Sequence, residues 1–154
     1  MATLAVLLSL HILSAVVGVG GMFAAYMCLR PAVGALEPPQ RLRLWRAFFQ
    51  KFFPWVWAAV LLLLASGYWM LIMTFGGFAG APLYINLMQA LAWAMIALFV
   101  WLFHGPWLAF KRAVDAQDWP AAAVRINRIR QIIMINLPLG LIVIAIGSTG
   151  RFWG

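Results

Sequence analysis

Long apolar segments alternate with short polar ones along the whole chain. A helix needs about 20 mostly apolar residues to cross the hydrocarbon core of a bilayer. Four segments reach this length, at about residues 4–29, 55–75, 83–110 and 132–148. The pattern predicts an all-α, integral membrane four-helix bundle that forms a single transmembrane domain, residues 1–154.

The charged residues gather in two of the three connections between these segments. The first connection has five Arg or Lys residues against one acid, Glu37, and the third has five against Asp115 and Asp118. The second connection, FGGFAGAPL, has no charge. Basic connections stay on the cytoplasmic side of a membrane. We therefore expect the first and third connections to be cytoplasmic and both termini to lie outside.

The basic connections have helical sequence patterns of their own. Residues 40–53, QRLRLWRAFFQKFF, mix basic and aromatic side chains as interfacial helices do, and Pro54 predicts a kink or the entry to the second span. In DWPAAAVRINRIRQ, Asp118 is a good N-cap and Pro120 lies in the first turn, so a helix begins there and runs into the fourth span.

Composition narrows the classes of function. Of the 154 residues, 66% are hydrophobic and 9% are charged, which is typical of an integral membrane protein. The net charge of +8 therefore sets the orientation of the chain in the lipid bilayer and does not indicate nucleic acid as a partner. The three carboxylates all lie in connections, so no paired-acid site can form within the membrane. We assign no catalytic residue and favour a protein that is not an enzyme. The single cysteine, Cys28, excludes an internal disulfide.

Small or polar residues recur at helical spacing on each span. A four-helix bundle would turn such stripes inward, where they permit close approach of helices or leave room for a ligand. The four stripes are His11, Ser14, Ala15, Gly18 and Met22; Ser66, Gly67, Met70 and Met73; Asn86, Ala90, Trp93, Ala97 and His104; and Asn136, Gly140 and Gly147.

His11 is the first candidate ligand, because ionisable groups within spans are usually functional or face the bundle. Met70, Met73 and Met88 should lie in the same outer half of the membrane. Imidazole and thioether together suit copper(I), a soft cation, and we name these four residues as a candidate metal site. Methionine also fills gaps in apolar cores, so packing alone is the alternative.

Haem b is the alternative cofactor, with His11 or His104 as an axial ligand. Both histidines lie on inward-running spans, and the rise of the helix puts His104 roughly 10–18 Å deeper than His11. The two ligands of one iron face each other across it, so this pair is not expected to share a haem.

Three stretches of the sequence resemble the CopD family, bacterial membrane proteins related to copper-resistance protein D. They are HILSAVVGVGGMFAAYMCLRPA, PLYINLMQAL and FKRAVDAQDWPAAAVRINRIRQIIMINLPLGLIVIAIGSTGR. The resemblance implies a short, single-bundle form in the bacterial cytoplasmic (inner) membrane, a role in copper handling, and a ligand role for His11. Asn86 stands where we expect a histidine in many relatives. A more distant likeness to HemJ-type proteins implies haem and a porphyrin substrate.

Three functions stay open at this point. The first is copper binding, transport or handling across the membrane. The second is a b-type haem membrane protein, in electron transfer or as a HemJ-like porphyrinogen oxidase. The third is a cofactor-free accessory subunit of a larger membrane complex; a homo-oligomer is a further possible assembly.

Overall fold

The computed structural model describes residues 1–153, and these are almost entirely helical. Gly154, the last residue of the predicted domain, lies outside the described residues. Four helical columns are long and apolar enough to cross a membrane, which confirms the all-α, four-span prediction. The columns are Ala2–Ala35, Pro38–Phe75, Leu83–Asp115 and Trp119–Phe152.

Each column is a run of helical elements. The first contains α1 (Ala2–Ala15), π-helical turns at Val16–Gly20 and Ala24–Leu29, α2 (Gly21–Phe23), α3 (Arg30–Ala32) and a 3-10 turn at Val33–Ala35. The second is α4 (Pro38–Phe75), followed by a 3-10 turn at Phe78–Gly80. The third contains α5 (Leu83–Leu102), a π-helical turn at Phe103–Trp107 and α6 (Leu108–Asp115). The fourth contains α7 (Trp119–Thr149) and a 3-10 turn at Gly150–Phe152.

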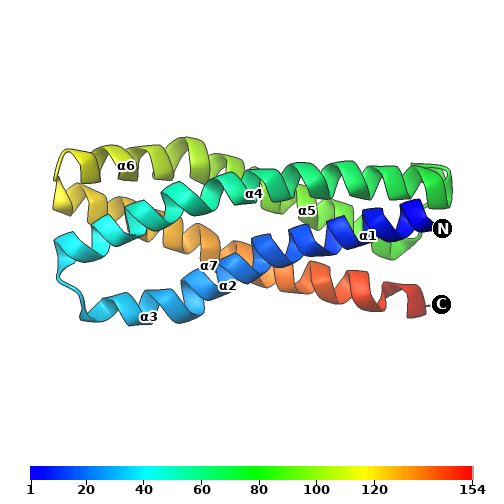
Figure 1. Cartoon of the computed structure of the whole chain (residues 1–154), viewed down its shortest axis with the longest axis horizontal. Coiled ribbons are helices and arrows are strands. Elements are labelled where there is room, and N and C mark those ends of the chain that lie inside the picture. Colours follow the sequence, from blue (N-terminus) through cyan, green and yellow to red (C-terminus); the bar gives the residue numbers. More distant parts are fainter. Residues whose placement is uncertain (154) are drawn as a thin grey trace.

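The columns run in alternating directions, and both chain ends lie at the same end of the bundle (Figure 1). We call this the terminal end; the uncharged connection between α4 and α5 also lies there. The opposite end, which holds the two charged connections, is the basic end. This arrangement fits the predicted topology, in which the basic end faces the cytoplasm, and that orientation stays a prediction.

The ends of two helices show how local sequence sets the fold. Asp118 Oδ1 accepts a hydrogen bond from the Ala121 amide at 3.0 Å, so the predicted N-cap of the fourth column is confirmed. α4 ends at Phe75 and is capped by Gly76, which adopts φ +68°. Few residues other than glycine take this left-handed conformation at low cost, and the Gly76 amide there donates to the Ile72 carbonyl.

The basic stretch 40–53 is the first part of α4 and not a separate helix. The helix continues through Pro54, although a proline removes one backbone hydrogen bond and crowds the preceding turn. Trp45, Phe49 and Phe53 repeat every four residues and are buried along one face of α4 up to the proline. Packing of this face holds the helix in register where the proline would otherwise end it.

Large aromatic residues fill the basic half of the bundle. Phe49 and Phe110 are among the largest fully buried side chains. Phe49 stacks on Phe53 with ring centroids 4.9 Å apart, and Phe53 meets Trp107 edge-on at 5.2 Å. These rings come from the second and third columns, so the cluster joins α4 to the segment around α6.

Small and polar residues mark the interior of the terminal half. Ser14, Ser66 and Gly140 are buried, as the stripes on the first, second and fourth spans predict, whereas Met73 and Gly147 of the second and fourth stripes are exposed. The helices approach closely there: a Cβ on Gly140 would lie 2.7 Å from a methyl group of Val19. Asn136 also joins two columns, because its side-chain amide donates to the Met95 carbonyl at 3.2 Å.

The prediction for the third stripe was wrong. Its five residues are all exposed on the outside of the bundle: Asn86, Ala90, Trp93, Ala97 and His104. The opposite face of this column carries Phe99 and Leu102, which are buried in the aromatic cluster. The polar groups of the stripe find partners without being buried: Asn86 donates to the Ala81 carbonyl at 3.2 Å, and the Trp93 indole N–H donates to the Tyr68 hydroxyl at 2.8 Å.

Candidate functional site

His11 lies between α1 and α4, where its imidazole meets a serine. His11 Nδ1 is 3.0 Å from Ser66 Oγ, a contact between residues 55 positions apart in sequence. Ser66 is buried and His11 is half-buried. Gly67 supplies the space for the ring, because a Cβ at that position would lie 3.0 Å from His11 Cε1. The Ser66–Gly67 pair therefore forms the surface of α4 against which the histidine ring packs.

The direction of the hydrogen bond follows from the chemistry of the hydroxyl. Ser66 Oγ donates its one hydrogen to the Leu62 carbonyl. Its oxygen is then an acceptor towards His11, so His11 Nδ1 carries the hydrogen and donates it. In a neutral imidazole this leaves Nε2 with a free lone pair. A histidine whose other nitrogen donates to a polar neighbour is the arrangement that metal-binding histidines adopt.

A shallow apolar groove lies beside the next turn of α1. It has a volume of about 140 Å³ and lies between the first and second columns. Ser14 of α1 and Val17 of the following π-helical turn line one side, and Trp55 and Ala59 of α4 line the other. The Ser14 hydroxyl donates to the Leu10 carbonyl at 2.7 Å and so is not free for a ligand. Small-molecule sites usually have about 300–1,000 Å³. The groove is too small for a haem with the helices in these positions.

The three candidate methionines do not form one group around His11. Met70 is half-buried on α4, one helical turn beyond Ser66 towards the terminal end. Met73, also on α4, is 52% exposed. Met88 packs between α5 and α7, since a Cβ on Gly147 would lie 3.1 Å from its Cε. Of the two methionines on this face of α4, Met70 is thus nearer to Ser66 along the helix and less exposed.

His104 lies at a different level of the bundle. Its ring is 6.4 Å from that of Trp57 and 5.3 Å from that of Phe103, measured between centroids. Trp57 precedes Ser66 by nine residues on α4, which corresponds to about 13 Å along a helix. His104 also donates from Nδ1 to the Val100 carbonyl at 3.0 Å and is exposed. This separation agrees with the expectation that His11 and His104 do not share an iron.

Other metal-ligating side chains are scattered. Within residues 1–153, no group of three or more His, Cys, Asp and Glu side chains comes together as a metal site. Cys28 is a free, exposed thiol.

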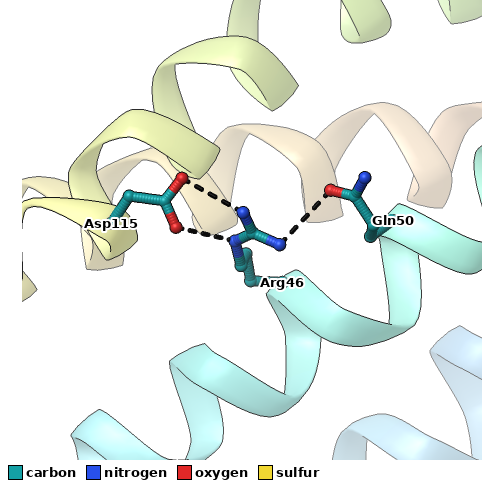
Figure 2. Close-up of polar contacts among 3 residues, drawn as sticks. All are labelled: Arg46, Gln50 and Asp115. Carbon is teal, nitrogen blue, oxygen red and sulfur yellow. Dashed lines mark hydrogen bonds and ion pairs between the residues drawn. The ribbon is translucent and has the colours of Figure 1, made fainter.

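One ion pair joins the second and third columns at the basic end (Figure 2). Arg46 binds Asp115 with two hydrogen bonds, Nε to Oδ1 at 2.9 Å and Nη2 to Oδ2 at 3.1 Å, and donates a third to Gln50 at 3.3 Å. The hydrogen bonds from Arg46 lower the pKa of the Asp115 carboxyl below its ordinary value. The pair fixes α4 against the end of α6, far from His11.

A family model for copper resistance protein D, CopD, matches residues 46–149. The chain belongs to the CopD family. The match covers more than half of the chain, and within it lie Ser66, Gly67, Met70 and His104. His11 precedes the matched residues, so the ligand role that the resemblance implied for His11 is not tested by the match. Comparison with curated proteins and with solved structures finds no match for this CopD family chain.

Sequence reasoning found His11 and placed Ser66 on an inward stripe but did not pair the two residues. The available signal was the Ser-Gly pair within an apolar span, since a serine there needs a hydrogen-bond partner and a glycine admits a neighbouring ring. The Arg46–Asp115 pair was also missed. Its partners lie 69 residues apart, and both connections offer several other charges.

Proposed function

We propose that this CopD family protein binds copper(I) at His11 and handles copper across the bacterial cytoplasmic membrane. The observation that supports it is the 3.0 Å contact between His11 Nδ1 and Ser66 Oγ within a span. Because the Ser66 hydroxyl donates to the Leu62 carbonyl, this contact assigns the hydrogen to Nδ1 and a lone pair to Nε2. A neutral, oriented imidazole in apolar surroundings is poised to accept a soft cation. The family's description supports copper as the cation.

Met70 is the second ligand in this proposal. It lies one turn from Ser66 on the same face of α4 and is half-buried, so it shares the α1 side of α4 with His11. Its thioether matches the soft character of copper(I). Met73, which lies at the surface, and Met88, which packs between α5 and α7, do not belong to the proposed site. The ion would enter from the terminal end, which the predicted topology places outside the cell.

A competition titration tests this function. The purified protein in detergent competes for copper(I) with a chromogenic chelator under reducing conditions. We expect the parent to take up copper and the His11→Ala variant to bind more than about 100-fold more weakly, because loss of an outer partner alone costs about 10–100-fold. His104→Ala and Met134→Leu serve as controls on other faces and should bind as the parent does.

Two results would contradict the proposal. One is a parent protein that takes up no copper, and the other is a His11→Ala variant with unchanged affinity. An absorption spectrum of the same preparation separates copper from the haem alternative. A strong Soret band that is lost in the His11→Ala variant would show that His11 binds haem b and not copper.

A further inference from the structure

A second cavity lies at the basic end of the bundle, away from His11. It has a volume of about 330 Å³, and residues of the first, second and fourth columns line it. This volume lies within the range of small-molecule sites. Arg30, Arg41 and Arg130 each reach it from a different column. Three residues far apart in sequence therefore bring positive charge to one space.

No carboxylate of residues 1–153 lines this cavity. The ion pair found among these residues joins Arg46 to Asp115 and uses none of the three arginines. Arg30 lies over the ring of Tyr26, 4.9 Å from its centroid, which orients its guanidinium without neutralising it. Like charges around one cavity repel one another, so an anion bound among them would relieve this repulsion.

The inner wall of the cavity is apolar. Trp45, Phe49, Ile129 and Ile133 line it and are buried in the core of the basic half. A ligand that fits this space has an anionic group at the arginines and an apolar part against the wall. Guanidinium groups form forked hydrogen bonds to phosphate, and three of them suit a group with several anionic oxygens.

We infer that this cavity binds the phosphate group of an amphiphilic molecule, with Arg30, Arg41 and Arg130 as its ligands. Two sources carry this chemistry: the headgroup of an anionic phospholipid from the surrounding leaflet, and a free phosphorylated compound. The cavity lies at the end where the charged connections meet the membrane surface, so both can reach it. The inference stands independently of the copper proposal.

The test is a binding titration of the full chain in detergent with three probes. They are short-chain phosphatidylglycerol, the matching diacylglycerol without phosphate, and inorganic phosphate. Arg41→Gln and Arg130→Gln remove one guanidinium each from different helices. Arg128→Gln is the matched control, because Arg128 is exposed on the same helix as Arg130 and does not line the cavity. This substitution removes the same charge as Arg130→Gln.

We expect saturable binding of phosphatidylglycerol and much weaker binding of diacylglycerol. Arg41→Gln and Arg130→Gln should each weaken binding by about tenfold or more, the cost of losing a hydrogen bond to a charged group, whereas Arg128→Gln should bind as the parent does. Competition by inorganic phosphate would indicate a free phosphorylated ligand. Its failure to compete would indicate the lipid headgroup.

A steric variant protects the test against misfolding of an arginine variant. Ala123 lines the cavity and is exposed, so Ala123→Phe narrows the space and keeps every charge. We expect it to weaken phosphatidylglycerol binding as well. Equal losses in all three glutamine variants, or equal binding of diacylglycerol and phosphatidylglycerol, would overturn the inference.

Discussion

The two halves of the bundle are packed by different means. In the basic half, rings from α4 and the third column interlock around Phe49, Phe53 and Trp107, and the Arg46–Asp115 pair adds a polar contact. In the terminal half, helices meet through small residues such as Gly67 and Gly140 and through single hydrogen bonds. The aromatic half gains rigidity from interlocked rings, yet a cavity remains beside Trp45 and Phe49 where three arginines meet. The small-residue half lets its helices approach closely and leaves room for the His11 imidazole between α1 and α4.

Truncation of a buried ring should give the largest effect. Phe49→Ala leaves a cavity among at least three other rings, and we expect a loss of about 3 kcal/mol in the free energy of unfolding. This value is at the low end for buried phenylalanine, since lipid shields apolar surface in the separated helices too. Unfolding equilibria in mixed detergents measure it. Leu61→Ala, at a 64% exposed position of α4, is the control. Equal losses in both variants would mean that the basic half is not the rigid part.

Removal of the partner of His11 should affect copper binding more than stability. Ser66→Ala deletes the acceptor that holds Nδ1, so the imidazole loses its fixed tautomer and orientation. We expect the affinity for copper(I) to fall by about 10–100-fold. The same chelator competition measures the change, with Ser148→Ala near the C-terminus as control. An unchanged affinity for the Ser66→Ala variant would show that the serine only packs.

The hydrogen bond of Asn136 should contribute little. Its amide nitrogen bonds the Met95 carbonyl, but its Oδ1 is buried with no hydrogen-bond partner within residues 1–153. Interhelical hydrogen bonds in membranes are worth about 0.6 kcal/mol on average, and an unpaired buried oxygen offsets that gain. We therefore expect Asn136→Leu to change the free energy of unfolding by less than about 1 kcal/mol. A loss of unfolding free energy as large as that of Phe49→Ala would contradict this expectation and show that polar contacts stabilise the terminal half.

The Arg46–Asp115 pair should give the smallest effect, and one that depends on pH. The ion pair with Arg46 lowers the pKa of Asp115 in the folded protein. The contribution of the pair to the free energy of unfolding is therefore present above the ordinary pKa of 3.8 and is lost as the pH falls through the lowered pKa. The Asp115 side chain is half exposed, so we expect the ion pair to contribute less than about 1 kcal/mol to the free energy of unfolding near neutral pH. Unfolding of parent and Asp115→Asn should therefore differ slightly at pH 6 and converge as the pH falls below 3. A difference that grows with acid would contradict this sign.

Local patterns in the sequence were enough to predict the spans and the Asp118 cap, because length, apolarity and capping depend on neighbouring residues. The inward face of the third column was not predictable in this way. Both faces of that helix are largely apolar, and the competition between Phe99 and the Asn86–His104 line is decided by the volume available in the bundle. The pairing of His11 with Ser66 likewise depends on how α1 and α4 are aligned, which no single span encodes. The arginine cavity was missed because three columns must meet to form it.

The copper K-edge X-ray absorption spectrum of the copper(I)-loaded protein would show whether His11 and Met70 bind the metal. It reports the atoms bound to the metal, independently of affinity. We expect one imidazole nitrogen and one thioether sulfur in the parent, loss of the nitrogen in His11→Ala, and loss of the sulfur in Met70→Leu. A spectrum with only oxygen ligands, or one that neither substitution alters, would contradict a copper site at His11.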